Sequence, residues 1–146
     1  PDLLFAALDA AELRQVRAAL ANPLPLYGTS SVNPGVGPGL DAPELNGVRL
    51  VDLPWEIQPD HPAVMVYPRP VGDELPLDLD RLYALGIDAF RVAREIALQG
   101  RALPPGAAFT LDGVTGKLKV GAGTFERVEA AAVYIDQGYQ PVVPAR

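Results

Sequence analysis

Hydrophobic and polar positions recur along the chain with two different periods, and the changes of period mark the predicted elements. The apolar run Leu3–Leu8 is typical of a buried strand. Asp9 then begins a helix, and Glu12 at its third position completes a capping box. Leu24–Thr29 forms a second short apolar run. Residues 1–29 therefore predict a βαβ unit with two parallel strands.

Turn-forming residues dominate the next part of the chain. Ser30–Pro43 is rich in Gly, Pro, Ser and Asn, which predicts a long surface loop that buries little apolar area. Gly47–Leu53 alternates apolar and polar residues and predicts a third strand, which the following proline ends. Residues 58–76 carry many prolines and fit no regular element, except that Ala63–Tyr67 suits a short turn of helix.

The longest helical pattern lies in the second half of the chain and stops near Gly100. Asp78 or Asp80 is the expected N-cap. Gly86, inside the helix, costs about 1 kcal/mol relative to alanine, so we expect its backbone to pack closely against a neighbouring element. The apolar positions recur at helical spacing, at Leu82, Leu85, Ala89, Val92, Ala93 and Ile96.

After this helix the period becomes that of strands. Asp136-Gln137-Gly138 suits a three-residue hairpin loop. The succession of elements predicts an α/β fold with a mixed, mostly parallel sheet, flanking helices and a C-terminal β ribbon. The four strands expected in this last third are Leu111–Gly113, Lys117–Val120, Arg127–Asp136 and Gln140–Val143.

Composition excludes several classes of function. A chain of 146 residues that is 49% hydrophobic can bury one sizeable core. Its 12 basic residues are scattered among 18 acidic ones, which argues against a nucleic-acid-binding surface. The absence of cysteine excludes thiol chemistry and disulfides. No apolar run reaches the roughly 20 residues that a membrane helix needs.

No catalytic, metal-binding or cofactor-binding constellation is predicted. His61 is the single histidine, so it cannot build a zinc site alone, and a solvated loop position is favoured for it. Ser30 and Ser31 lie outside any Gly-x-Ser-x-Gly elbow. The glycines of residues 35–39 match neither a dinucleotide-binding nor a Walker pattern.

Five residues are candidates for contacts with a small polar ligand. Tyr27, Thr29, Ser30 and Ser31 lie at the end of a predicted parallel strand, where open α/β sheets commonly bind ligands. An ordinary transition from strand to loop is the alternative for these four. Asp88 places a charge within an apolar helix and therefore needs a partner, for which a structural hydrogen bond is favoured over a ligand.

The order of several segments resembles the type I periplasmic-binding-protein superfamily and, within it, the LpoA (LppC) family of penicillin-binding protein activators. The most specific parts are the helix at Leu82–Phe90 and the turn Gly113-x-Thr115-Gly116-x-Leu118. Arg127 and Ala131–Gly138 resemble the closing ribbon of that family. The other matching segments are Pro1–Phe5, Leu26–Ser30, Leu45–Val48 and Leu111–Leu118.

This resemblance implies that the chain is a fragment, the C-terminal portion of the family's binding-protein-like domain. Residues 1 to about 53 would lie mainly in the second lobe, and the helix at about 77–100 would lie in the first. Residues 108–146 would form the strands that cross between the lobes and the strands that close the domain. The proline-rich residues 58–76 depart from the family, where a helix is expected.

The resemblance also implies a function. The chain would belong to a non-catalytic lipoprotein on the periplasmic side of a Gram-negative outer membrane, held by a lipid anchor that this chain lacks. Its partner would be a bifunctional class A penicillin-binding protein, the peptidoglycan synthase that it activates. The alternative is a periplasmic solute-binding module for a small polar ligand such as an amino acid.

Overall fold

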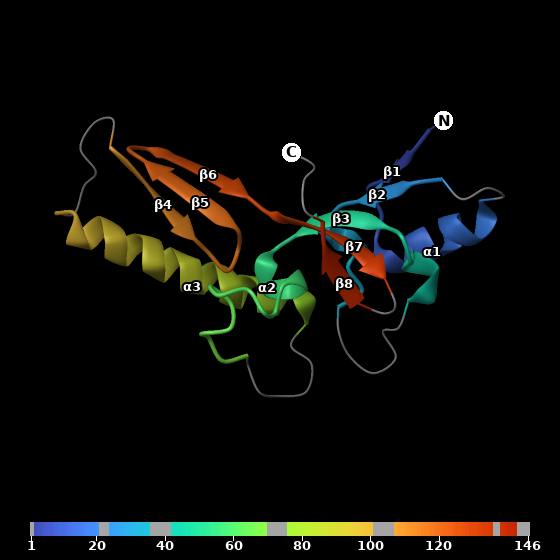
Figure 1. The fold of residues 1–146 in the computed structure, drawn as a ribbon, viewed down its shortest axis with the longest axis horizontal. Helices are drawn as coiled ribbons and strands as arrows, with labels where there is room; N and C mark the ends of the chain where they lie inside the picture. The colour runs from blue at the N-terminus through green and yellow to red at the C-terminus, as the bar shows by residue number, and fades with distance from the viewer. Residues whose placement is uncertain are drawn as a thin grey trace. The chain divides into compact units, whose positions relative to one another are not determined.

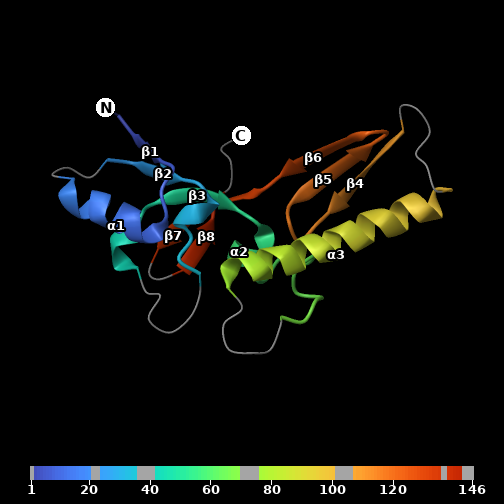
Figure 2. The ribbon, with the colours of Figure 1, turned by 180° about the vertical axis from the view of Figure 1, so that it is seen from behind.

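The protein is described here from a computed structural model, which places residues 2–20, 24–35, 42–69, 76–100, 107–135 and 138–142. The chain divides into two compact units (Figure 1). The first unit comprises Pro1–Asp52 and Ala130–Arg146, and the second comprises Leu53–Glu129. Figure 2 shows the same elements from behind.

A five-stranded mixed sheet forms the first unit. Its strand order is β1-β2-β3-β7-β8. The first three strands are parallel, and β7 pairs antiparallel with β3 and with β8. The predicted βαβ unit is therefore confirmed, as is the C-terminal ribbon. The bounds are Leu4–Ala6 for β1, Leu26–Gly28 for β2, Arg49–Asp52 for β3, Ala130–Ile135 for β7 and Gly138–Pro141 for β8.

Helix α1, Ala10–Ala19, connects β1 to β2 and packs against one face of this sheet. The predicted capping box is present: Asp9 Oδ1 accepts from the amide of Glu12 at 2.8 Å, and the Asp9 amide donates to the Glu12 carboxylate at 3.1 Å. Leu13 is fully buried, and it shares a core with Leu26 and Val48. This core fixes α1 on the sheet.

Two expectations for the first unit are wrong. The Leu3–Leu8 run is not uniformly buried, because Phe5 projects from the face of the sheet that α1 does not cover. Ser30–Pro43 is more than a surface loop. It contains the 3-10 turn η1, Ser30–Val32, and leads into a second, η2, at Pro43–Leu45. These turns satisfy backbone groups locally and so allow apolar side chains of the loop, such as Val32, to be buried.

The second unit consists of a short helix α2, Pro54–Ile57, the long helix α3, Leu77–Leu98, and a three-stranded antiparallel sheet. Val92 of α3 packs against Leu118 and Val120 of the central strand. A second cluster forms around Trp55, which is fully buried. The sheet strands are β4, Ala108–Asp112, β5, Lys117–Gly121, and β6, Thr124–Val128.

The start of α3 differs from the prediction. Pro76 is the N-cap, and no side chain caps the helix. Asp78 and Asp80 instead lie in the first turn, where negative charge favours the helix dipole. Asp78 pairs with Arg81 at 3.6 Å, and Asp80 pairs with Arg69 at 3.3 Å. The predicted capping role is therefore wrong.

The buried face of α3 also differs from the predicted one. Ala84, Asp88 and Val92, four residues apart, are its buried positions, whereas Leu82 and Leu85 are exposed. Gly86 does not pack closely, because no described atom lies within 4 Å of the place where its Cβ would stand. The helix itself is confirmed, but its orientation is not the one expected.

Strand boundaries account for the remaining differences. The predicted strand Arg127–Asp136 is two strands, β6 and β7, which belong to different sheets. Gly138 was predicted as part of the hairpin loop, but it is the first residue of β8 and pairs with Ile135 of β7. The other two predicted loop positions, 136 and 137, lie outside the described residues. Within the proline-rich stretch, backbone hydrogen bonds confirm a turn at residues 61–67, and residues 70–75 lie outside the description. Among the described helices, α3 included, none has the length and hydrophobicity that a bilayer span requires.

Candidate functional site

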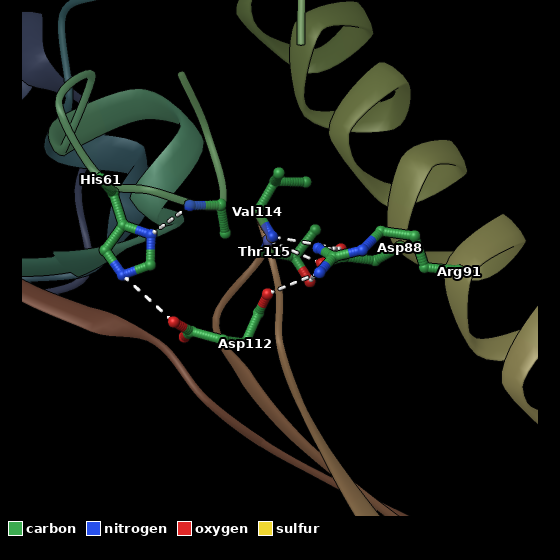
Figure 3. A network of polar contacts seen from close by, with 7 residues as sticks. His61, Asp88, Arg91, Asp112, Val114 and Thr115 are labelled. Carbon is green, nitrogen blue, oxygen red and sulfur yellow. Dashed lines mark hydrogen bonds and ion pairs between the residues drawn. The ribbon is translucent and has the colours of Figure 1, made fainter. Parts of the chain in front are cut away.

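Asp88 is a buried carboxylate of the second unit, which α3 places against the turn between β4 and β5 (Figure 3). Its side chain is buried, with a residue exposure of 2%. One carboxylate oxygen accepts hydrogen bonds from the amide and the hydroxyl of Thr115, at 2.8 and 2.7 Å. The other accepts from the amide of Val114 at 3.1 Å. Arg91, one helical turn further on, lies 3.2 Å from the same oxygen.

The two glycines of this turn explain why the sequence pattern Gly113-x-Thr115-Gly116 accompanies Asp88. A Cβ at Gly113 would collide with the Asp88 carboxylate. Gly116 has a φ of 134°, which side chains rarely adopt, and a Cβ there would collide with the carbonyl oxygen of Val128. Glycine at 113 therefore leaves room for the Asp88 carboxylate, and glycine at 116 leaves room for the backbone of Val128.

His61 lies beside this network, and its place differs from the solvated loop that was expected. Its Nε2 is 3.8 Å from the carboxylate of Asp112 at the end of β4, and its Nδ1 accepts from the amide of Ala63 at 3.2 Å (Figure 3). Its side chain is 25% exposed. Arg91 donates to the backbone carbonyl of Asp112 at 2.9 Å, which links the histidine and the Asp88 network through one residue.

The ligand candidates of the first unit do not share one surface. Tyr27 lies on the sheet face opposite α1, where the guanidinium of Arg49 is 5.5 Å from its ring centre. Thr29 caps η1 by accepting from the amide of Ser31 at 3.4 Å. Ser30 and Ser31 lie within that turn, and Ser31 is exposed. Asp88 belongs to the second unit. The ligand role of these five residues stays a prediction.

A buried polar group at the C-terminal end of β3 was not predicted. Asn33 donates to the carboxylate of Asp52 at 2.8 Å and accepts from the hydroxyl of Tyr139 and the amide of Gly35, both at 2.8 Å. Asn33 and Asp52 are both buried. One signal was available: Asp52 takes an inward position in the alternation that buries Leu50.

Within each described polar cluster, the hydrogen-bonding groups mainly pair with other groups of the same cluster. Asp88 accepts three hydrogen bonds from the turn that it holds, and Asn33 makes three within its own unit. In the part of the chain that the structure describes, no three His, Cys, Asp or Glu side chains gather as a metal site would need. These arrangements hold turns and strand ends in place, which is a structural role.

A comparison with family models decides the relationship. The family described as "LppC putative lipoprotein" matches residues 1–131. The chain belongs to the LppC family. No curated protein matches its sequence.

Solved structures agree with this family and with the mixed α/β fold. An LpoA (YraM) C-domain from Haemophilus influenzae, a regulator of PBP1A, is 28% identical with a TM-score of 0.68, over 97% of this chain and 45% of that one. Full-length LpoA from the same organism is 25% identical with a TM-score of 0.68, over 96% of this chain and 26% of that one.

A third structure points in another direction. It is described as "a putative branched-chain amino acid ABC transporter" from Chromobacterium violaceum. This chain is 46% identical to it with a TM-score of 0.75, over 91% of this chain and 42% of that one. The LppC chain thus spans less than half the length of the solved structures it resembles.

Proposed function

We propose that this LppC chain is part of a lipoprotein that regulates peptidoglycan synthesis by activating a bifunctional class A penicillin-binding protein. The observation that carries the proposal is the likeness to the Haemophilus influenzae LpoA C-domain, a regulator of PBP1A, over 97% of this chain. In the proposal the lipoprotein acts on the periplasmic side of the outer membrane of a Gram-negative cell.

A non-catalytic role agrees with how the polar side chains are used. The carboxylate of Asp88 accepts hydrogen bonds from Val114 and Thr115, and the side-chain amide of Asn33 donates to Asp52 and accepts from the amide of Gly35. Nucleophilic and acid–base catalysis need a group that is positioned towards a substrate. The described clusters instead hold a turn and a strand end in place.

The assignment of the chain to two lobes belongs to the same proposal. Residues 1 to about 53 would lie mainly in the second lobe, and the helix at about 77–100 would lie in the first. Residues 108–146 would form the strands that cross between the two lobes and close the domain. The division of the chain after Asp52 and after Glu129 supports this assignment.

Direct binding tests the partner. The natural polypeptide that carries this sequence is immobilised, and the class A penicillin-binding protein of the same organism is passed over it. A monofunctional transpeptidase from that organism is the control for unspecific contact. We expect saturable binding of the class A protein alone. Equal or absent binding of both would contradict the proposed partner.

A periplasmic solute-binding module is the second candidate. It is favoured by the 46% identity to the Chromobacterium violaceum protein and by the hydroxyls of Thr29, Ser30 and Ser31 at a parallel strand end. Calorimetry of the natural polypeptide with leucine, isoleucine and valine tests it, with glutamate as the control. Heat released by the branched-chain amino acids alone would favour this second function, and no heat with any of them would oppose it.

A further inference from the structure

The chain passes between its two units twice, and both connections leave the first unit at the same place. One connection follows Asp52 at the end of β3, and the other precedes Ala130 at the start of β7. These two residues are partners in the antiparallel register of β3 and β7. The second unit therefore begins with Leu53–Trp55 on one connection and ends with residues 127–129 on the other.

The turn between β4 and β5 contacts both of these connecting segments within the second unit. On the first, the amide of Trp55 donates to the carbonyl of Val114 at 2.9 Å, and Leu53 packs in the same buried cluster as Val114. On the second, the backbone of Gly116 lies so close to Val128 that a Cβ at Gly116 would collide with the Val128 carbonyl oxygen. One short turn thus touches both connections.

The same turn is bonded to the middle of α3. Asp88 accepts hydrogen bonds from the amides of Val114 and Thr115 and from the Thr115 hydroxyl (Figure 3). Arg91 lies 3.2 Å from the Asp88 carboxylate and donates to the carbonyl of Asp112, the residue before the turn. Val114 and Thr115 are buried, so a break in these hydrogen bonds would leave buried polar groups without partners, which is costly.

Little chain lies between the turn and the sheet of the first unit. Only Leu53 separates β3 from α2, and only Glu129 separates β6 from β7. On the sheet side, the buried carboxylate of Asp52 accepts from Asn33 at 2.8 Å, which fixes the end of β3. Because a single residue cannot absorb a large shift, a displacement of the turn has to be passed along both connections.

We propose that the turn at residues 113–116 is a coupling element, which joins α3 to both connections between the units. Asp88 and the Thr115 hydroxyl hold the helix to this element. A contact that displaces α3 then acts on the segments at Trp55 and Val128 together. Asp88 works through the turn and is a positioning residue. The inference concerns how the chain transmits a contact, and it does not depend on which of the two candidate functions is correct.

Thr115→Val tests the coupling, because it removes one hydrogen bond to Asp88 and nearly keeps the size of the side chain. Thr115→Ser keeps the hydroxyl, and Thr110→Val makes the same chemical change at an exposed position of β4. Each variant is made in the natural polypeptide that carries this sequence. Hydrogen–deuterium exchange is measured in peptides that cover residues 52–58 and 126–131, with peptides from α1 and from residues 92–98 as references.

We expect Thr115→Val to speed exchange in both connecting segments by at least about tenfold, because their local opening then breaks one hydrogen bond fewer. Both reference peptides, and all peptides of Thr115→Ser and Thr110→Val, should stay within about threefold of the unchanged polypeptide. Faster exchange in one connection only, or in neither, would overturn the coupling. An equal rise throughout the second unit would also overturn it, because that pattern indicates a general loss of stability.

Exchange of the unchanged polypeptide at low urea concentrations is a second test, and it needs no substitution. Amides of one cooperative element open together and respond to urea with the same slope. We expect the two connecting segments and the turn at residues 113–116 to share one slope and one opening free energy. Separate slopes for the two connections would contradict a single coupling element, whatever the Thr115 variants show.

Discussion

Replacing Asp88 with asparagine should destabilise the second unit of this LppC chain strongly. Asparagine keeps the shape of the side chain but removes its charge and turns one acceptor oxygen into an NH₂ group. In the structure both carboxylate oxygens accept from the turn that follows β4, one from Val114 and the other twice from Thr115. Whichever way the amide is oriented, at least one backbone N–H faces a donor.

The magnitude follows from these contacts. The hydrogen bonds that remain change from charged to neutral, which loses about 1 kcal/mol. The backbone N–H that loses its acceptor is buried, and an unsatisfied buried donor costs about 1–3 kcal/mol. The substitution should therefore cost about 2–4 kcal/mol of the free energy of unfolding, a large part of the roughly 5–15 kcal/mol typical of a domain.

Urea unfolding followed by tryptophan fluorescence measures this cost. Trp55 is the single tryptophan of the chain, and it is fully buried in the second unit. A loss of this size should lower the urea midpoint by on the order of 1–2 M for a domain of this length. The signal reports the unit that contains Asp88, so unfolding of the first unit does not confuse it.

Asp78→Asn is the matched control, because it makes the same chemical change on the same helix. Its side chain is 92% exposed, pairs with Arg81 at 3.6 Å and lies in the first turn of the helix, so the loss of the ion pair and of the interaction with the helix dipole should stay near or below about 1 kcal/mol. Equal midpoints for the Asp88 variant, the control and the unchanged chain would refute the structural role. They would return Asp88 to the status of a candidate ligand residue.

Three other substitutions test further parts of the fold. Gly116→Ala should cost several times more than Gly123→Ala in the same urea assay, because both have a positive φ but only a Cβ at Gly116 meets the carbonyl of Val128. Asn33→Ala should cost about 2–4 kcal/mol, seen as faster amide exchange at the C-terminal end of β3, and unchanged exchange there would contradict its bridging role. Asp9→Ala should cost about 1 kcal/mol, seen as faster exchange in the first turn of α1 alone, and uniform protection would contradict the capping box.

Local patterns predicted the elements whose residues interact with near neighbours in the sequence. The capping box of α1 needs only Asp9 and Glu12, and both contacts are present. The period of α3 was equally clear, but its orientation was not. Leu82 and Leu85 are apolar and yet exposed, whereas Val92 packs against the sheet. Hydrophobicity alone therefore could not indicate which face of α3 is buried. Tertiary packing makes that choice.

The polar contacts of the site could not be predicted in full from the sequence, because they join residues that are far apart in the chain. Asp88 was expected to need a partner because it is charged within an apolar helix, and the structure supplies one 27 residues away in Thr115. Asn33 and Tyr139 are 106 residues apart, and no local pattern connects them. The strand predicted at Arg127–Asp136 divides between two sheets, which depends on the partners that each half finds.

The rate of glycan-strand synthesis tests the proposed role of this LppC chain most directly. The class A penicillin-binding protein of the same organism is supplied with lipid-linked disaccharide, with and without the natural polypeptide that carries this sequence. The account predicts a rate that rises with the polypeptide's concentration, reaches a plateau and does not depend on added leucine. A rate that stays unchanged at concentrations that saturate binding would contradict activation.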